Sequence, residues 1–163
     1  MAYHALRSAG GVPVDQLGMN VKQYIRGVQS ELFRALDARK HPDYRGGFEP
    51  IPDVVIFGPE IAGDWRRRRA EQTLAASLLV IEVKVSERAR RRLTAGEVIS
   101  DIRKLAAHRA EATARGTGFH PIVLVLDTAP EAIERMTASS LSQVREAAEV
   151  EQVELRYVNS STS

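Results

Sequence analysis

The sequence predicts an α/β fold in which a mixed central β-sheet is flanked by α-helices. Three apolar runs, at residues 52–57, 77–85 and 120–128, are typical of strands, and segments with helical spacing of apolar residues precede, separate and follow them. This order of elements indicates a mixed sheet with helices packed on it. The chain of 163 residues is long enough for one domain that buries about 70% of its unfolded surface without disulfides.

A first helix is predicted to begin at Asn20. Asn20 and Gln23 form a capping-box pattern, which marks the start of many helices. Apolar residues then recur at helical spacing: Val21, Ile25, Val28, Leu32 and Leu36. The helix is expected to end before Pro42 and the glycine pair Gly46 and Gly47, which stop helical propagation.

The strand at 77–85 is predicted to be central, because its aliphatic run is continuous enough for burial on both faces. The run at 52–57 opens with Pro52, and a strand tolerates proline best at its first residue. Residues 58–72 lie between these two strands and are expected to form a polar connection.

A second capping box, formed by Thr94 and Glu97, predicts a helix that runs to about Arg115. The helix is expected to stop at Gly116 and Gly118, because glycine is favoured just past a helix end.

A third capping box, formed by Thr128 and Glu131, predicts a helical stretch with a break near the serines at 139–140. Residues 153–158 alternate weakly between apolar and polar side chains and are expected to form a final edge strand.

The predicted domain organisation is a flexible arm at 1–18, one domain at 19–158 and a polar tail at 159–163. The arm is rich in glycine, proline and polar residues. The chain has no cysteine, which excludes thiolate metal sites and fits a reducing compartment. No stretch has the length and hydropathy of a signal peptide or a membrane span, so a cytoplasmic protein with no membrane partner is expected.

Two ionisable residues, Glu82 and Lys84, interrupt the most apolar predicted strand. Residues two apart on a strand share a face, at a separation of about 7 Å. Burying ionised groups without partners is costly, so a partner is expected beside them. Asp53, at the start of the preceding predicted strand, would converge with Glu82 if the two strands pair.

Two carboxylates with open water positions suit magnesium or manganese, which prefer oxygen ligands. Hydrolysis of a phosphodiester needs a nucleophile near neutral pH and relief of charge on the phosphate, and a metal with a nearby ammonium supplies both. The alternative is a buried ion-pair network of Asp53, Glu82 and Lys84 that only stabilises the fold.

The pattern resembles the restriction-endonuclease-like PD-(D/E)xK nuclease superfamily. Pro52-Asp53 is similar to the "PD" and Glu82-Val83-Lys84 to the "ExK", with 28 residues between Asp53 and Glu82. The resemblance covers roughly residues 20 to 128. It implies that Asp53, Glu82 and the backbone carbonyl of Val83 bind a divalent metal, and that Lys84 orients the attacking water and stabilises charge on the phosphate.

Further candidate residues lie on the predicted helices. Glu31 falls at the fringe of the first apolar stripe, where its carboxylate would point inward, and members of this superfamily often carry such a glutamate near the metal. The alternative is a solvated helix glutamate. On the second helix four polar residues share one face: Glu97, Asp101, Lys104 and His108. Asp101 and Lys104 are expected to face the phosphate or to support the metal ligands, as in some nucleases of this class, and the alternative is a solvent-exposed salt-bridged face.

The net charge is only +2, but arginines are clustered in two runs that flank the predicted strands. These runs, together with Lys104, are candidates for contact with a nucleic-acid backbone: Arg66, Arg67, Arg68, Arg69, Arg88, Arg90, Arg91 and Arg92. Trp65 or Phe57 would then stack on a base. The alternative is a solvated, arginine-rich connection.

The sequence therefore predicts a metal-dependent endonuclease that acts on DNA with Mg²⁺, or with Mn²⁺ as a substitute. A catalytically inactive nuclease fold used for nucleic-acid binding or complex assembly is the alternative. Because no separate recognition domain is evident, a homodimer or a larger DNA-processing complex is expected.

Overall fold

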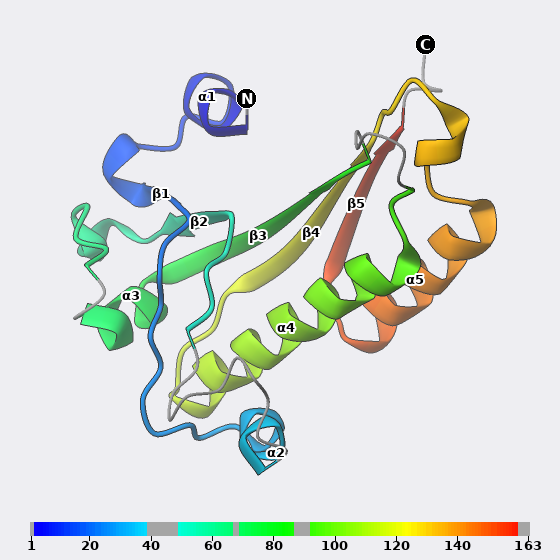
Figure 1. Ribbon diagram of the computed structural model, residues 1–163. Helices are drawn as coiled ribbons and strands as arrows, with labels where there is room; N and C mark the ends of the chain where they lie inside the picture. The colour runs from blue at the N-terminus through cyan, green and yellow to red at the C-terminus, as the bar shows by residue number, and fades with distance from the viewer. Residues whose placement is uncertain (1, 39–48, 67–68, 87–91, 160–163) are drawn as a thin grey trace. The chain divides into compact units, whose positions relative to one another are not determined.

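The computed structural model describes residues 2–38, 49–66, 69–86 and 92–159. It confirms the α/β prediction: a mixed five-stranded sheet, in the strand order β1-β2-β3-β4-β5, is flanked by helices (Figure 1). The strands are β1 Leu17–Met19, β2 Val54–Phe57, β3 Ser77–Val85, β4 His120–Asp127 and β5 Glu154–Asn159. The helices are α1 Ala2–Ser8, α2 Glu31–Ala38, α3 Ala70–Ala75, α4 Ala95–Ala114 and α5 Ala138–Val150.

The chain divides into two compact units. The first contains residues 1–80 and 107–120, and the second contains 81–106 and 121–163. β3, α4 and β4 each pass from one unit to the other, so this division does not contradict the predicted single domain at 19–158, which stays a prediction.

In the first unit, the helix predicted from Asn20 is wrong over its first eleven residues, because α2 begins only at Glu31. Asn20 and Gly27 both have positive φ, 51° and 59°, which a helix does not allow. Gln23 is buried and uses its polar groups elsewhere: its backbone N–H donates to Pro50 O, and its side-chain amide donates to Ser77 Oγ at 3.1 Å. Tertiary contacts therefore override the helical spacing of the apolar residues.

The segment predicted as an arm at 1–18 contains regular structure. Residues 2–8 form α1, and residues 17–19 form β1, which pairs antiparallel with β2. A side chain at Gly18 would collide with its neighbours, since a Cβ there would lie 2.5 Å from Val21 Cγ2 and 2.9 Å from Phe57 Cε2. The predicted boundary between residues 18 and 19 thus falls inside a strand.

The polar connection predicted at 58–72 also contains structure that its sequence did not indicate. A 3-10 turn forms at Pro59–Ile61, and α3 begins at Ala70. The backbone N–H of Gly58 donates to Ala76 O at 2.8 Å, which fixes the segment at both of its ends.

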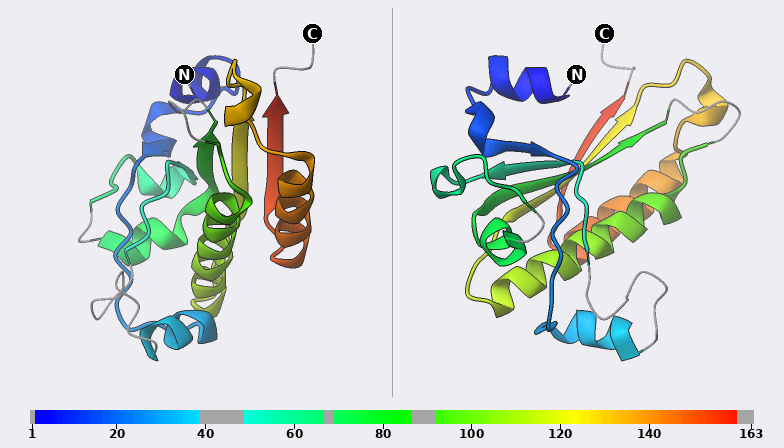
Figure 2. Two further views of the ribbon diagram at one scale, coloured as in Figure 1. Left: turned by 45° about the vertical axis from the view of Figure 1, so that its right-hand side comes forward. Right: turned by 60° about the vertical axis from the view of Figure 1, so that its left-hand side comes forward.

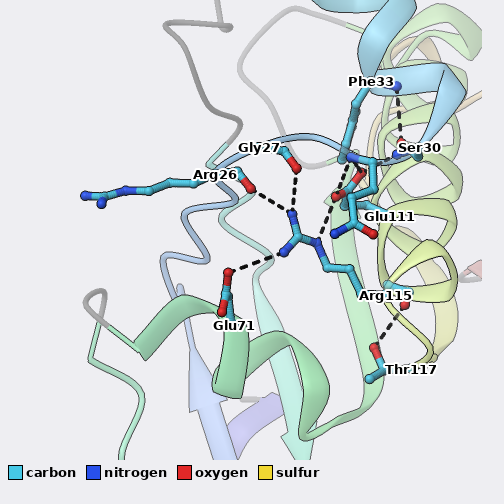
Figure 3. A network of polar contacts seen from close by, with 10 residues as sticks. Arg26, Gly27, Ser30, Phe33, Glu71, Glu111, Arg115 and Thr117 are labelled. Carbon is cyan, nitrogen blue, oxygen red and sulfur yellow. Dashed lines mark hydrogen bonds and ion pairs between the residues drawn. The ribbon is translucent and has the colours of Figure 1, made fainter.

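Glu111, in the last turn of α4, and Arg115, the residue directly after the helix, hold the chain that leads into α2 (Figure 3). The buried Glu111 carboxylate accepts from the backbone N–H groups of Gln29, at 3.0 Å, and Ser30, at 2.8 Å, and from Arg115 Nε at 2.8 Å. Arg115 Nη2 also donates to the carbonyls of residues 26 and 27, at 2.8 and 3.2 Å. We refer to these side chains and backbone groups as the Glu111 cluster.

The Glu111 cluster satisfies a carboxylate that has no exposed surface. Burial raises the pKa of Glu111, but the backbone donors of Ser30 and Gln29 and the guanidinium of Arg115 outweigh that effect and hold the pKa below its ordinary value. Ser30 then caps α2, because its Oγ accepts from the Phe33 N–H at 3.3 Å. The cluster therefore determines where α2 begins.

His108 is a second buried polar residue of α4. Its ring lies 4.7 Å from that of Phe119, and its Nε2 has no hydrogen-bond partner among the described residues. Burial lowers the pKa of His108 to about 3, with a smaller opposing effect of the Glu111 charge. The imidazole is therefore neutral in the folded protein at neutral pH.

In the second unit, the capping box of Thr94 and Glu97 is confirmed. Thr94 Oγ1 accepts from the Glu97 N–H at 3.4 Å, and the Glu97 carboxylate accepts from the Thr94 N–H at 3.1 Å. α4 follows from Ala95 to Ala114, close to the predicted bounds. The predicted final edge strand is also confirmed, since β5 pairs in parallel with β4 and ends the strand order.

The helix predicted from Thr128 is wrong, because α5 begins only at Ala138. The buried Asp127 carboxylate accepts from the Met136 N–H at 3.0 Å and from the Tyr157 hydroxyl, which holds residues 128–136 as a turn. Thr137 is the N-cap, accepting from the Ser140 N–H at 3.0 Å. The serines at 139–140, predicted as a break, lie in the first turn of α5.

Removing Arg115 tests the Glu111 cluster. Arg115→Met should lower the free energy of unfolding by about 3–5 kcal/mol, because Glu111 would stay buried without its cation. Glu71→Ala is the matched control: Glu71 Oε1 also contacts Arg115, at 3.5 Å, but its side chain is 82% exposed, so the loss should be below about 1 kcal/mol. Urea unfolding of both variants measures this, and equal losses would contradict the assignment.

Because of His108, the free energy of unfolding should decrease as the pH becomes acidic. The folded pKa of about 3 lies below the unfolded value of 6.5, so the contribution of neutral His108 is complete above pH 6.5 and is lost as the pH falls toward 3. The loss should reach a few kcal/mol, since each pH unit is worth at most about 1.4 kcal/mol.

Urea unfolding at about pH 7 and about pH 4 measures this loss, with His108→Leu as the control that lacks the titrating group. The variant should lose less stability than the wild type over that interval. A parallel loss in the two proteins would show that other groups cause it.

Candidate functional site

Asp53 lies directly before β2 in the first unit and is half-buried. Its backbone carbonyl accepts from the Asn20 N–H at 3.2 Å, next to the β1–β2 ladder. Pro52 is buried and lies before the strand, so β2 begins two residues later than the predicted start of the strand at Pro52. The position of Asp53 is thus fixed by its own backbone hydrogen bond to Asn20 and by the β1–β2 pairing that follows it.

The three residues of the predicted "ExK" lie within β3, whose bounds match the predicted 77–85. Glu82, Val83 and Lys84 belong to the second unit and are all half-buried. Alternation along the strand places Glu82 and Lys84 on the same face. Asp53 belongs to the first unit and Glu82 to the second.

Lys84 has an acidic partner, which the sequence predicted only as one of four polar residues on one face of the second helix. Its Nζ lies 2.5 Å from Oδ2 of Asp101, on α4, and Asp101 is only 7% exposed. The contact has the distance of an ion pair but not the angles of a hydrogen bond. The face of β3 that carries Lys84 and Glu82 is therefore the face toward α4.

Lys104 is the second cation at Asp101, with Nζ 3.5 Å from Oδ1 and a side chain that is 59% exposed. Asp101 thus holds two ammonium groups, one half-buried and one in solvent. The Asp101 carboxylate therefore brings the ammonium groups of Lys84 and Lys104 close to each other.

The predicted polar face of α4 is not one solvent-exposed surface. Glu97 caps the helix, Asp101 and His108 are buried, and Lys104 is exposed. The prediction of a common environment for these four residues is therefore wrong for His108, which packs on Phe119.

Glu31 is exposed at the first residue of α2. The expected inward orientation assumed a helix that began at Asn20. Because the helix starts eleven residues later, Glu31 lies in its first turn, where a carboxylate interacts favourably with the helix dipole.

The first arginine run has an acidic partner nearby. Asp64 Oδ1 accepts from Arg66 Nε at 2.6 Å and Oδ2 from Arg66 Nη2 at 2.7 Å, while Arg69 Nε lies 2.9 Å from Oδ2. The hydrogen bonds from Arg66 lower the pKa of Asp64 to about 2. Arg66 and Arg69 are exposed, so this segment is a local group of two arginines and one aspartate.

In the second run, Arg92 is exposed and donates from Nε to Ile133 O at 3.0 Å. The remaining predicted phosphate contacts lie outside the described residues: Arg67, Arg68, Arg88, Arg90 and Arg91.

The expectation that Phe57 stacks on a base is wrong, because Phe57 is fully buried. Its ring stacks on that of Trp65, with centroids 5.9 Å apart. Trp65 keeps some exposed surface, but its Nε1 is buried without a hydrogen-bond partner among the described residues. The pair anchors the arginine-bearing segment to β2.

Sequence reasoning missed two buried carboxylates. Glu111 and Arg115 carry the i,i+4 spacing of an ion pair, a signal that was present but not used. Asp127 gave no local signal, since its partners Met136 and Tyr157 are nine and thirty residues away.

The chain matches no family model, no curated protein and no solved structure. The resemblance to the PD-(D/E)xK nucleases therefore stays a prediction from the residues. No helix in the described part of the chain is long and apolar enough to cross a membrane.

The two lysines at Asp101 make a matched test of the site. Lys84→Met should cost about 2 kcal/mol of unfolding free energy, because Asp101 is buried and loses its nearer cation. Lys104→Met removes the exposed cation from the same carboxylate and should cost less than about 1 kcal/mol. Urea unfolding of both variants measures the difference, and the reverse order would show that Lys84 does not compensate Asp101.

Proposed function

We propose that the protein is a magnesium-dependent endonuclease that hydrolyses phosphodiester bonds in DNA, with manganese as a substitute. One observation carries the proposal: Glu82 and Lys84 share a strand face on which a buried aspartate holds the lysine ammonium. Asp53 supports it, because it directly precedes β2, the neighbour of β3 in the sheet order.

In this proposal, Lys84 is the residue that contacts the phosphate. Its ammonium is held at 2.5 Å by Asp101, yet a quarter of the side chain is exposed, so it retains access to a ligand. In this role Lys84 orients the attacking water and stabilises negative charge on the phosphate. Asp101 is a positioning residue, because it acts only by fixing the ammonium.

The donor set fits magnesium. Among the described residues, no three His, Asp or Glu side chains are grouped to hold a metal ion. In this proposal the ion would have the carboxylates of Asp53 and Glu82, the Val83 carbonyl and water as ligands, and magnesium usually retains several waters. When bound, it would lower the pKa of a water and offset charge on the phosphate.

The arginines and Lys104 are proposed to attract the DNA backbone. Arg66, Arg69, Arg92 and Lys104 are exposed, as such a role requires. The partner of Arg66 and Arg69, Asp64, reduces the local charge, so phosphate would have to compete with a carboxylate for these guanidinium groups.

A catalytically inactive fold that binds nucleic acid or assembles with partners is the second candidate. The observation that favours it is the same ion pair, because Asp101 already compensates Lys84 and a compensated lysine can serve stability alone. Cleavage and metal binding separate the two candidates.

Cleavage of supercoiled DNA with magnesium or manganese, and its loss in a chelator, is the expected activity. Asp53→Ala and Glu82→Ala should each abolish it with an unchanged circular dichroism spectrum, because each removes a ligand charge. Asp15→Ala, at an exposed aspartate of the first unit, is the control and should cut normally. Full activity in both ligand variants would overturn the site.

Thermal unfolding tests metal binding without DNA. Magnesium or manganese should raise the melting temperature, since a ligand at one hundred times its dissociation constant adds about 2.7 kcal/mol to stability. The shift should vanish in Asp53→Asn and persist in Lys84→Ala, which should bind metal but not cut. A wild type without a shift would favour a structural network, whereas a metal-bound protein that binds DNA without cutting would favour the inactive fold.

A further inference from the structure

The outer edge of β5 has no neighbouring strand within the described part of the chain. β5 pairs in parallel with β4 over six residues, from Ile122 opposite Glu154 to Asp127 opposite Asn159, and it ends the strand order (Figure 2). An edge strand presents alternate N–H and C=O groups that another strand can pair with. Such an edge is a docking surface if its side chains select a partner.

A groove of about 460 Å³ runs between α5 and β5. Its apolar lining comes from Ala148, Val153, Leu155 and Tyr157, and its charged lining from Arg145, Glu149 and Arg156. The Tyr157 hydroxyl is engaged by Asp127, so the ring offers its apolar surface to the groove. A strand added at the edge would place side chains of alternate residues over this apolar lining.

We propose that a second copy of this chain docks here, by antiparallel pairing of the two β5 strands about a two-fold axis through Leu155. This register places Glu154 of each copy opposite Arg156 of the other, and Val153, the residue directly before β5, opposite Tyr157. One face of the ribbon then carries two cross-strand ion pairs, and the other carries an apolar cluster. Shifting the register by one residue toward the C-terminus would instead place the two Arg156 side chains opposite each other.

The charged residues of β5 and α5 support a second copy of the chain as the docking partner. Arg156 forms an ion pair with Glu154 in the same strand, and this pair would be exchanged for two pairs between copies. On α5, Arg145 and Glu149 are one turn apart and both line the groove, so the groove carries charges of both signs. A surface that is charge-complementary to its own two-fold image selects a second copy over an unrelated peptide.

The pairing is tested by charge exchange, with mass measured by light scattering after size exclusion. The wild type should have twice the mass of one chain, whereas Glu154→Arg and Arg156→Glu should each be monomeric, because like charges then face each other. Mixing these two variants should restore dimers, and the double variant Glu154→Arg/Arg156→Glu should be dimeric by itself. Glu146→Arg, an exposed α5 residue outside the groove, should leave the dimer intact.

Cross-linking tests the register directly, because the chain has no cysteine of its own. Leu155→Cys should form an intermolecular disulfide on mild oxidation, since opposite residues of an antiparallel pair have Cα atoms about 4.5–5.5 Å apart. Val158→Cys is the control: in this register its two copies are about 20 Å apart, at roughly 3.3 Å per residue, and should stay reduced.

A monomeric wild type would overturn the proposal, as would a dimer that neither single charge reversal weakens. Failure of the double variant to dimerise, with a wild-type circular dichroism spectrum, would also overturn it. Cross-linking of Val158→Cys but not of Leu155→Cys would show that a different register or a different surface forms the dimer.

Discussion

The buried Glu111 carboxylate is the constraint on which the first unit depends. It has no exposed surface, so its charge must be met by donors inside the protein, and two backbone N–H groups and one guanidinium supply them. Those two N–H groups belong to Gln29 and Ser30, the residues that lead into α2. A charge on α4 therefore determines the path of a segment that precedes it by more than eighty residues.

The second unit relies on the same kind of interaction, a buried carboxylate that selects a local conformation. Asp127 bonds to Met136 and Tyr157, and this fixes both the turn before α5 and the ring that lines the groove. Asp101 holds Lys84 in the interior of a strand that would otherwise be apolar. In each case one buried carboxylate is the partner of a polar side chain, Tyr157 or Lys84, whose position the hydrophobic pattern alone does not explain.

The sequence correctly predicted the elements that depend on residues close together in the chain. β3 was predicted to the residue from its aliphatic run, and α4 from a capping box that forms as expected. The helices expected from Asn20 and Thr128 failed, because the groups that hold those segments lie far away in sequence. At the candidate site, the sequence correctly required a partner for Lys84, but it could not single out Asp101 among the polar residues of α4.

Gly18 has no side chain, and the packing of Phe57 against Trp65 depends on the space that this leaves. Even a methyl group there would press on Phe57, and Phe57 stacks on Trp65, which leads into the arginine-bearing segment. A small substitution in a three-residue strand would therefore disturb a surface that it does not touch. In genetic terms, codon 18 is a place where a temperature-sensitive allele is to be expected, since overpacking lowers the free energy of unfolding and the remaining stability is lost first on heating.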